Sequence, residues 1–551
     1  MVLQLFVALL GISFMSTLVT QGRRRRVWSV LILLALSALS YFFMNSININ
    51  EQGTFLYQWL PYNTIKADFS LISTLKMRQM YMALVLILVG SVYLNTIYRS
   101  ENHSLHFNTL LLLSFISLIL LVSSHDFLQL MFASSLFSII NFYMPDVVLA
   151  KRKSLIFNFL AEMSLFIGLS IIYGQTGSIS FSEINSFFNA GRHRDLVGFL
   201  LMFAVGCKSG LFLLNGQYYD LKHATFNRTI SIMLLSSPIC GAVLLLKLRQ
   251  FFEASDLASQ VMPFWCQISI LTALLGVFLK NNIKSKNISF GLMIYAFMLH
   301  LIYKDTSLFY NIVPNLLMVL AQTYAIFILI KDQLPEDMDI FDFGCLKQNL
   351  KISSAPIILM LLSIISGLSY YMQSAYGKVF SCLYLFSLLV VLKMICSSSD
   401  CNQVPPQNIK RTTLFYLLPM TITSIWILYY NQAWSNLGAI KIFFVVMILA
   451  ILYPAEFFRQ IGRKKLLRID ILSAIYAVVI IKPLQFFGRI LWLAFDVVVL
   501  ERSIIASISK TSQIIVGIMH KLQEAGKWSC FISIIIGLII MLIYYWSRVN
   551  V

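Results

Sequence analysis

Long apolar runs, separated by short polar connections, dominate the pattern of this chain. A helix needs roughly 20 predominantly apolar residues to cross a bilayer. By that measure the pattern predicts an all-α, polytopic protein with about sixteen membrane spans. The spans are expected near residues 2–20, 27–45, 80–98, 107–124, 127–148, 154–174, 197–216, 229–247, 263–280, 288–303, 309–330, 354–371, 378–397, 412–430, 437–453 and 530–547.

A long segment near the C-terminus, residues 461–527, departs from this pattern. Its charges Lys482, Arg489 and Asp496 recur every seven residues, almost two helical turns, and therefore lie on one stripe of a helix. Three charges and Pro483 do not suit a membrane span. The pattern therefore predicts a lateral amphipathic helix that lies along the membrane, followed by a final anchoring helix.

The polar connections carry a signal for orientation. Loops on the cytoplasmic or matrix side are enriched in Lys and Arg, and the cluster Arg23–Arg26 marks one such loop. Alternation from there places further basic clusters on the same inner side: Lys151–Lys153, Lys222–Arg228 and Lys280–Lys286. The Ser-rich connection 176–195 then falls outside. The polar, aromatic connection 45–78 is too long for a turn, so we expect a small external hairpin there.

Composition supports the membrane interpretation. Charged residues make up 12% of the chain, against about 25% in an ordinary soluble protein. In a soluble domain a net charge of +19 would suggest that the protein binds nucleic acid. Here the basic residues lie in short loops between apolar runs. No nucleic-acid partner is expected. The eight cysteines form no CxxC pair, and the sequence predicts neither a metal site nor a cofactor.

A few ionisable residues interrupt the predicted spans, where an unpaired charge is costly and a functional role is the default hypothesis. Glu162 and Lys208 lie in the middle of the sixth and seventh spans, His300 and Lys304 end the tenth, and Lys378 begins the thirteenth. Glu162 and Lys208 are predicted to form a proton relay with coupled proton affinities. A static salt bridge is the alternative for this pair, and interfacial snorkelling is the alternative for the other three.

The eighth span contains Ser236, Ser237 and Pro238. Proline removes one backbone hydrogen bond from a helix, and neighbouring hydroxyls can satisfy the freed carbonyl. The three residues predict a broken helix, a feature of ion-translocating folds.

Three segments carry a resemblance to a known family. The lateral segment reads Lys482-Pro483-Leu484, Arg489, Leu491-Trp492 and Asp496, the sixth span reads Phe157-Asn158-Phe159-Leu160-Ala161-Glu162, and the seventh contains Lys208-Ser209. With these motifs the chain resembles the distal antiporter-like subunit of respiratory complex I. That family comprises subunit L of bacterial NADH-quinone oxidoreductase and chain 5 of the mitochondrial NADH dehydrogenase.

The resemblance implies an architecture of two inverted five-helix repeats. It implies six regions: N-terminal helices with the hairpin (1–105), a first repeat (106–250), a second repeat (251–400), additional helices (401–460), the lateral helix (461–527) and the anchor (528–551). It also implies a membrane-arm subunit of a proton-pumping NADH:quinone oxidoreductase, without a redox centre of its own. Its partners would be other membrane-arm subunits, reached through the lateral helix, in a bacterial or mitochondrial inner membrane.

Departures from the family pattern leave two alternatives open. The family's Trp-Glu on the fifth span would fall near residues 133–136, where this chain has no acid. The family's broken-helix His corresponds to Met233, and the first base of its His-Ala-Phe-Phe-Lys motif corresponds to Lys304. One alternative is a structural copy that does not pump. The other is the large subunit of a cation/proton antiporter.

Overall fold

The computed structural model describes residues 54–62, 65–71, 104–124, 126–177, 193–235, 237–280, 282–304, 309–331 and 374–396, together with scattered single positions. The chain divides into two units, Met1–Ile469 and Asp470–Val551. In the second unit the described residues are single helical positions, among them Arg489. The predicted lateral helix, with Lys482, Pro483 and Asp496, and the predicted anchor otherwise lie outside the described residues. The predicted spans 2–20, 27–45, 412–430 and 437–453 lie outside them entirely.

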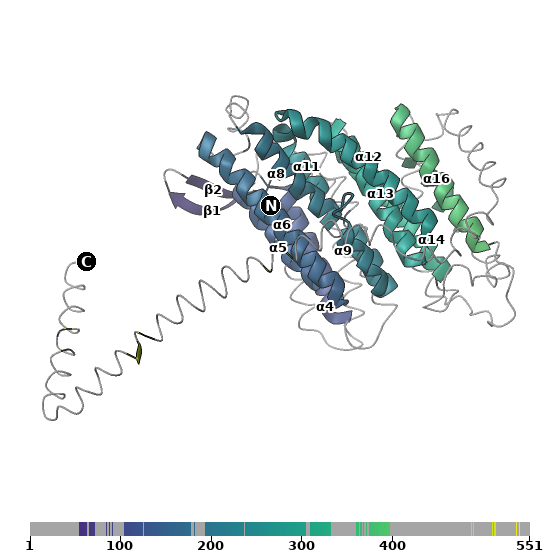
Figure 1. The fold of residues 1–551 in the computed structure, drawn as a ribbon, viewed down its shortest axis with the longest axis horizontal. Coiled ribbons are helices and arrows are strands. Elements are labelled where there is room, and N and C mark those ends of the chain that lie inside the picture. The colour runs from purple at the N-terminus through teal and green to yellow at the C-terminus, as the bar shows by residue number, and fades with distance from the viewer. Residues whose placement is uncertain are drawn as a thin grey trace. The chain divides into compact units, whose positions relative to one another are not determined.

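Helices form the body of the first unit (Figure 1). Those of ten residues or more are α4 (Ser104–Val122), α5 (Phe127–Tyr143), α6 (Val148–Thr176), α8 (Arg194–Ser209), α10 (Phe226–Leu235), α11 (Ser237–Glu253), α12 (Asp256–Leu279), α13 (Ile283–Lys304), α14 (Phe309–Lys331) and α16 (Ala375–Cys396). Neighbours in sequence pack together, as α4 does with α5 and α12 with α13, while α8 packs on α6 and on α11. The bundle therefore brings the fifth to eighth predicted spans into one group.

Several of these helices suit a bilayer. Four stretches of the described residues are long and apolar enough to cross it: Val148–Thr176, Phe226–Glu253, Asp256–Leu279 and Ile283–Lys304. On α6 and α12, large apolar side chains such as Phe159, Phe166 and Phe264 are exposed on the bundle surface. Exposed apolar surface of this extent is typical of helices that face lipid or another subunit. The prediction of a multi-pass membrane protein is confirmed.

A two-stranded sheet accompanies the helices. Strand β1 (Thr54–Tyr62) pairs antiparallel with β2 (Ile65–Leu71), from Thr54 opposite Leu71 to Tyr62 opposite Ile65. Two register shifts, between Phe55 and Tyr57 and between Gln58 and Leu60, interrupt the pairing. Aromatic residues, which are enriched in strands, recur along β1. A hairpin thus lies within residues 45–78, as expected, and adds a small sheet to the predicted all-α class. Its external placement stays a prediction.

Contacts between connections agree with the predicted alternation of the spans. Lys153 Nζ lies 2.6 Å from Asp220 Oδ2, and Arg228 pairs with Asp146 at 3.5 Å. Both pairs join connections that alternation assigns to the inner side. Ser255 Oγ donates to Asp195 Oδ1 at 2.9 Å, which joins two outer connections. Each contact therefore links two connections of the same parity.

The seventh predicted span, 197–216, is wrong in its second half. Helix α8 ends at Ser209, and the chain leaves it through Gly210, whose φ of 69° lies in the left-handed region. Glycine is the usual residue at such a helix end because it has no Cβ to clash. The loop passes a second left-handed residue, Leu213, before the short helix α9 (Gly216–Tyr219). The helix therefore stops one residue after Lys208.

Candidate functional site

Lys208 occupies the last turn of α8, and its side chain is completely buried. The helix end around it is held by the following segment. The carbonyl of Lys208 accepts a hydrogen bond from Tyr218 Oη at 2.8 Å, and the carbonyl of Cys207 accepts one from Gln217 Nε2 at 3.0 Å. Carbonyls in the last turn of a helix lack partners within the helix, so these two side chains complete its hydrogen bonding and fix the backbone of Lys208.

A third anchor for this segment comes from α12. Trp265 Nε1 donates to the Phe212 carbonyl at 2.9 Å, and the Phe212 amide donates to Ser269 Oγ at 2.8 Å. Both backbone groups of Phe212 are therefore paired inside the bundle, where an unpaired group costs several kcal/mol. Side chains of α9 and α12 therefore hold the turn that follows Lys208.

Glu162 reaches Lys208 from the middle of α6. Its Oε1 lies 2.6 Å from Lys208 Nζ, within hydrogen-bond distance for a charged pair. The Glu162 side chain is 16% exposed, so the carboxylate forms the side of the pair nearer to the bundle surface. Close approach of α6 and α8 is possible because Gly168 lies directly against Leu201. The structure thus brings the two central predicted site residues together.

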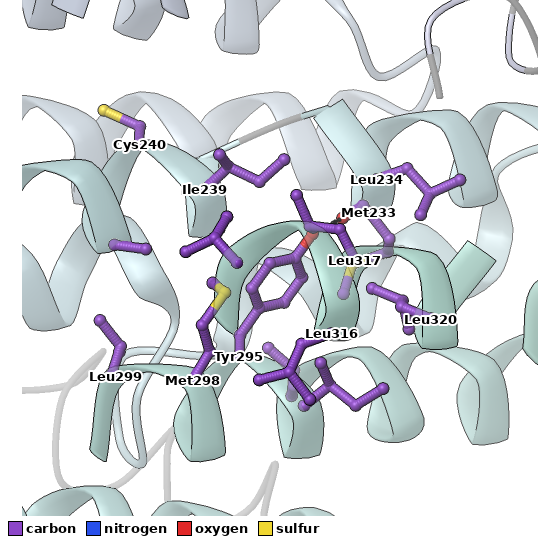
Figure 2. Close-up of a cluster of buried hydrophobic side chains, with 14 of the residues drawn as sticks. Met233, Leu234, Ile239, Cys240, Tyr295, Met298, Leu299, Leu316, Leu317 and Leu320 are labelled. Atoms are coloured by element: carbon purple, nitrogen blue, oxygen red, sulfur yellow. Dashed lines mark hydrogen bonds between the residues drawn. The ribbon is translucent and has the colours of Figure 1, made fainter. Parts of the chain in front are cut away.

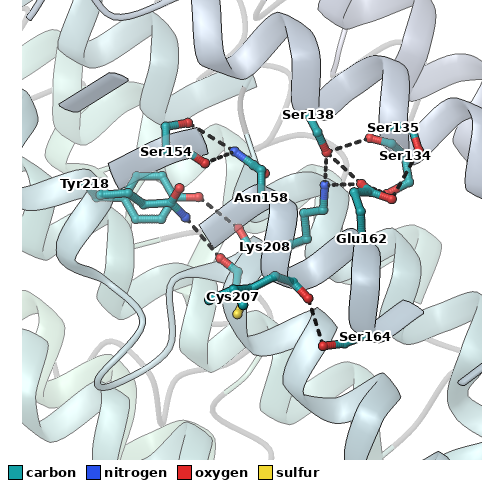
Figure 3. Close-up of polar contacts among 12 residues, drawn as sticks. Ser134, Ser135, Ser138, Ser154, Asn158, Glu162, Ser164, Cys207, Lys208 and Tyr218 are labelled. Carbon is teal, nitrogen blue, oxygen red and sulfur yellow. Dashed lines mark hydrogen bonds and ion pairs between the residues drawn. The ribbon is translucent and has the colours of Figure 1, made fainter. Parts of the chain in front are cut away.

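Three serines of α5 surround the carboxylate (Figure 3). Ser134 and Ser138 donate to Glu162 Oε1 at 2.7 Å and 2.6 Å, and Ser135 donates to Oε2 at 3.2 Å. Lys208 Nζ also donates to Ser138 Oγ. The Ser138 hydroxyl therefore accepts from the ammonium and can donate to the carboxylate, which adds an indirect link to the direct ion pair.

Two of these serines lie in the part of α5 where the resembled family has an acidic residue. Ser134 and Ser135 lie within residues 133–136, the place of the Trp-Glu of the resembled family, and they bind the carboxylate of Glu162 instead. The serines were missed in the sequence analysis. Their spacing was the available signal, because Ser134 and Ser138 stand four residues apart and share one helix face.

Chemically, the site is a buried acid–base pair with hydroxyl partners. Desolvation of two charges opposes their burial, and mutual attraction plus additional hydrogen bonds offsets that cost. A proton that moves from Lys208 to Glu162 neutralises both groups, and the serine hydroxyls can reorient to serve either state. The arrangement can store or release a proton when its surroundings change.

His300, Lys304 and Lys378 lie elsewhere, on α13 and α16. The His300 side chain is buried, and its ring centroid lies 4.1 Å from that of Tyr376. Lys304 Nζ lies 5.7 Å from the centroid of the same ring, and both Lys304 and Lys378 are exposed. Two of the three thus contact Tyr376, whereas Lys208 forms hydrogen bonds with residues of α5, α6 and α9.

The predicted break at Ser236, Ser237 and Pro238 falls between α10 and α11. Ser236 and the side chain of Ser237 lie outside what the structure describes, and Pro238 is the second residue of α11. The broken helix therefore remains a prediction.

Two further buried lysines were missed as intramembrane groups. Lys286 lies in the first turn of α13, rather than in a connection, and donates to the Val277 carbonyl at 2.6 Å. Lys247 of α11 donates to the Ser124 carbonyl at 2.7 Å. Val277 belongs to the last turn of α12, and Ser124 lies just after the end of α4. Both lysines therefore bind carbonyls at the C-terminal ends of neighbouring helices, where a cation is stabilising.

Among the described residues no group of three or more His, Cys, Asp and Glu could hold a metal ion.

Comparison with known proteins points to one group of membrane subunits. No protein-family model matches the chain. It is 30% identical over 205 residues to the chloroplastic NAD(P)H-quinone oxidoreductase subunit 5 of Piper cenocladum, which is 34% of this chain and 27% of that protein. It is 26% identical over 275 residues to the same subunit of Dioscorea elephantipes, which is 46% of this chain and 36% of that protein. The matches thus span about a quarter to a third of these relatives.

The fold is shared with solved structures that include the following two. One is the membrane-bound sulfane sulfur reductase, an archaeal respiratory membrane complex, with a TM-score of 0.61 and 14% identity over 80% of this chain and 99% of that chain. The other is the Mrp complex of a Dietzia species, with a TM-score of 0.62 and 12% identity over 99% of this chain and 63% of that chain. The resemblance to antiporter-like subunits of membrane-bound complexes is confirmed by the curated relatives and by these folds.

Proposed function

We propose that this chain, which is similar to subunit 5 of NAD(P)H-quinone oxidoreductases, is a membrane-arm subunit that moves protons in response to quinone reduction elsewhere in its complex. The observation that carries the proposal is the buried Lys208–Glu162 pair, 2.6 Å apart inside the bundle. A buried pair of this kind marks an ion pathway by default. The NADH and quinone chemistry would belong to partner subunits, in an energy-transducing membrane such as the bacterial or mitochondrial inner membrane.

In this mechanism Lys208 loads a proton and Glu162 is its counter-charge. The Glu162 carboxylate lies 2.6 Å from the Lys208 ammonium and attracts it. Movement of α6 relative to α8 would weaken this attraction and release the proton from Lys208. Ser134 and Ser138 of α5 hold the carboxylate in place, and Tyr218 and Gln217 hold the helix end that carries Lys208.

Replacement of Lys208 tests the proposal. The purified assembly containing full-length chain is reconstituted into liposomes, and proton uptake during turnover is followed with a pH-sensitive dye. We expect Lys208→Met to reduce uptake at least about tenfold, the scale at which loss of one proton-transfer group is felt. Lys286→Met is the matched control, because Lys286 is equally buried but bound to a helix-end carbonyl. Unchanged uptake in Lys208→Met would favour a structural copy that does not pump.

A stand-alone cation/proton antiporter is the second candidate, favoured by the match to the Mrp complex over 99% of this chain. Mass spectrometry of the assembly purified in mild detergent separates the two. Co-purified NADH-oxidising and quinone-site subunits support the first candidate, and small antiporter subunits without them support the second.

A further inference from the structure

Tyr295 connects two helices at the centre of the bundle. It lies on α13, is fully buried, and donates from Oη to the Met233 carbonyl of α10 at 2.6 Å. Figure 2 shows this hydrogen bond inside an apolar cluster from α10, α11, α13 and α14. The labelled members are Met233, Leu234, Ile239, Cys240, Tyr295, Met298, Leu299, Leu316, Leu317 and Leu320. The phenol is thus a polar group held among hydrocarbon side chains.

The position of Tyr295 along α13 places it between two groups of ionisable residues. Leu292 lies beside Gly210, at the end of the helix that carries Lys208. Tyr295 follows about one turn later, and His300 follows about a turn and a half after that, at 1.5 Å per residue. A proton that travels along α13 from the Lys208–Glu162 site toward His300 must pass the level of Tyr295.

The Met233 carbonyl needs this partner. It lies in the last turn of α10, where backbone carbonyls lack donors within the helix. A backbone carbonyl left unpaired among apolar groups costs several kcal/mol. The Tyr295 hydroxyl supplies the missing donor and thereby ties α10 to α13.

The same hydrogen bond blocks proton transfer. Proton passage needs a hydrogen-bonded chain of titratable side chains or water. Near Met233 lie the hydroxyls of Tyr295 and Tyr324; the first donates to the Met233 carbonyl, and the second has no hydrogen-bond partner among the described residues, so the two hydroxyls form no such chain. The single hydroxyl proton of Tyr295 is directed at a backbone carbonyl, which cannot pass it on. Packing of Met233 against Gly291 leaves room for no further group, since a Cβ at Gly291 would collide with both Met233 and Tyr324.

We propose that Tyr295 is a positioning residue that holds closed an apolar barrier between the Lys208–Glu162 site and the half of the bundle that carries His300. This inference rests on the proposed function, because a barrier matters only where protons are loaded. When the hydrogen bond to Met233 breaks, α10 can separate from α13 and the barrier opens. The barrier therefore prevents protons from leaking through the subunit when no turnover drives it.

Passive proton conductance tests the barrier. The assembly with full-length chain is reconstituted into liposomes, a pH gradient is imposed without substrate, and its decay is recorded. Loss of a hydrogen bond worth about 1 kcal/mol raises the open population roughly fivefold. We expect Tyr295→Phe to raise the leak rate by this factor.

Tyr324→Phe is the matched control. Tyr324 is also fully buried, lies on the neighbouring helix α14 beside Met233, and its hydroxyl has no hydrogen-bond partner among the described residues. Its replacement keeps the ring and should leave the leak unchanged. An unchanged leak in Tyr295→Phe, or an equal rise in both variants, overturns the proposal.

A second pair of variants tests the barrier if the Tyr295→Phe variant does not assemble. Met233→Gln places a polar group in the barrier and should raise the leak, whereas Met233→Leu keeps it apolar and should not. Equal leak in these two variants also overturns the barrier. Since leak is measured without turnover, its result is independent of proton uptake in Lys208→Met, which tests the proposed function.

Discussion

At the scale of single residues, the centre of this protein is a lysine and a glutamate that would each be unfavourable alone. Lys208 is completely buried, and Glu162 accepts hydrogen bonds from it and from three serines of α5. Removal of one partner from such a buried pair leaves an uncompensated charge, whereas removal of both removes the desolvation cost as well. The energetic dependence of each residue on the other is therefore measurable.

Glu162→Gln should lower stability by about 3–5 kcal/mol, because Lys208 loses its counter-charge. The double variant Glu162→Gln with Lys208→Met should recover most of this loss. Chemical denaturation of the detergent-solubilised chain, run as a double-mutant cycle, measures the coupling. Additive effects of the two substitutions would contradict a strong interaction between them.

Asp195, at one end of the bundle, offers a residue-scale prediction for pH. Hydrogen bonds from the Ser255 hydroxyl and the Leu257 amide hold the pKa of the Asp195 carboxyl below its usual value. A lowered pKa in the folded state stabilises the fold above the unfolded-state pKa, and this stabilisation is lost as pH falls through the folded-state pKa. Ser255 is also the N-cap of α12, because its Oγ accepts a hydrogen bond from the Ala258 amide.

Asp195→Asn should therefore lower the melting temperature near neutral pH, and the difference from the wild type should shrink as pH falls below about 4. Thermal unfolding at a series of pH values checks this. A difference that stays constant down to pH 2 would rule out the carboxylate as its origin.

At the scale of elements, the end of α8 decides where the lysine can be. Apolar residues continue beyond Ser209, so the pattern predicted a continuous span, yet the chain turns at Gly210. The turn is stable because Gln217 and Tyr218 donate to carbonyls in the last turn of α8, and Trp265 donates to the Phe212 carbonyl in the loop that follows. Lys208 thus lies at the end of a helix inside the bundle, where side chains of α9 bind the carbonyls of Cys207 and Lys208.

Gly210→Ala should destabilise the chain by about 1–2 kcal/mol from backbone strain alone, and by more because the new Cβ would collide with the Tyr218 ring. Gly174→Ala is the control, since Gly174 lies in α6 with nothing near its missing side chain and should gain up to about 1 kcal/mol. Denaturation midpoints compare the two. Equal effects would mean that the turn at Gly210 does not need a left-handed residue.

At the scale of the whole molecule, the described helices of the first unit form an apolar bundle whose connections are joined by ion pairs and a hydrogen bond. Connections predicted to lie inside meet through Lys153–Asp220 and Arg228–Asp146, and connections predicted to lie outside meet through Asp195 and Ser255. The fold is shared with subunits of larger membrane complexes. We therefore expect the C-terminal segment to serve attachment to such a complex.

Charge reversal at Lys482, Arg489 and Asp496 should weaken this attachment, because the three charges share one stripe of the predicted lateral helix. The amount of chain that co-purifies with partner subunits should fall at least several-fold. Lys410→Glu with Arg411→Glu changes charge outside the helix and is the control. Undiminished co-purification in the stripe variant would contradict a role of the lateral helix in assembly.

The sequence by itself determined the membrane character, the place of the hairpin within residues 45–78, the described helices in outline, and the residues Glu162 and Lys208 as candidates. These features depend on local properties: the length of apolar runs, the placement of basic loops, and the rarity of charges inside spans. Only the tertiary structure showed that Ser134, Ser135 and Ser138 bind Glu162, that α8 ends after Ser209, and that Tyr295 binds Met233. These partners lie 24 to 62 residues apart in sequence, and apolar periodicity specifies which face of a helix is buried but not which side chain meets it there. The site is therefore formed by the packing of the helices. The hydrophobic pattern limits how the helices can pack, but it does not specify which side chains meet.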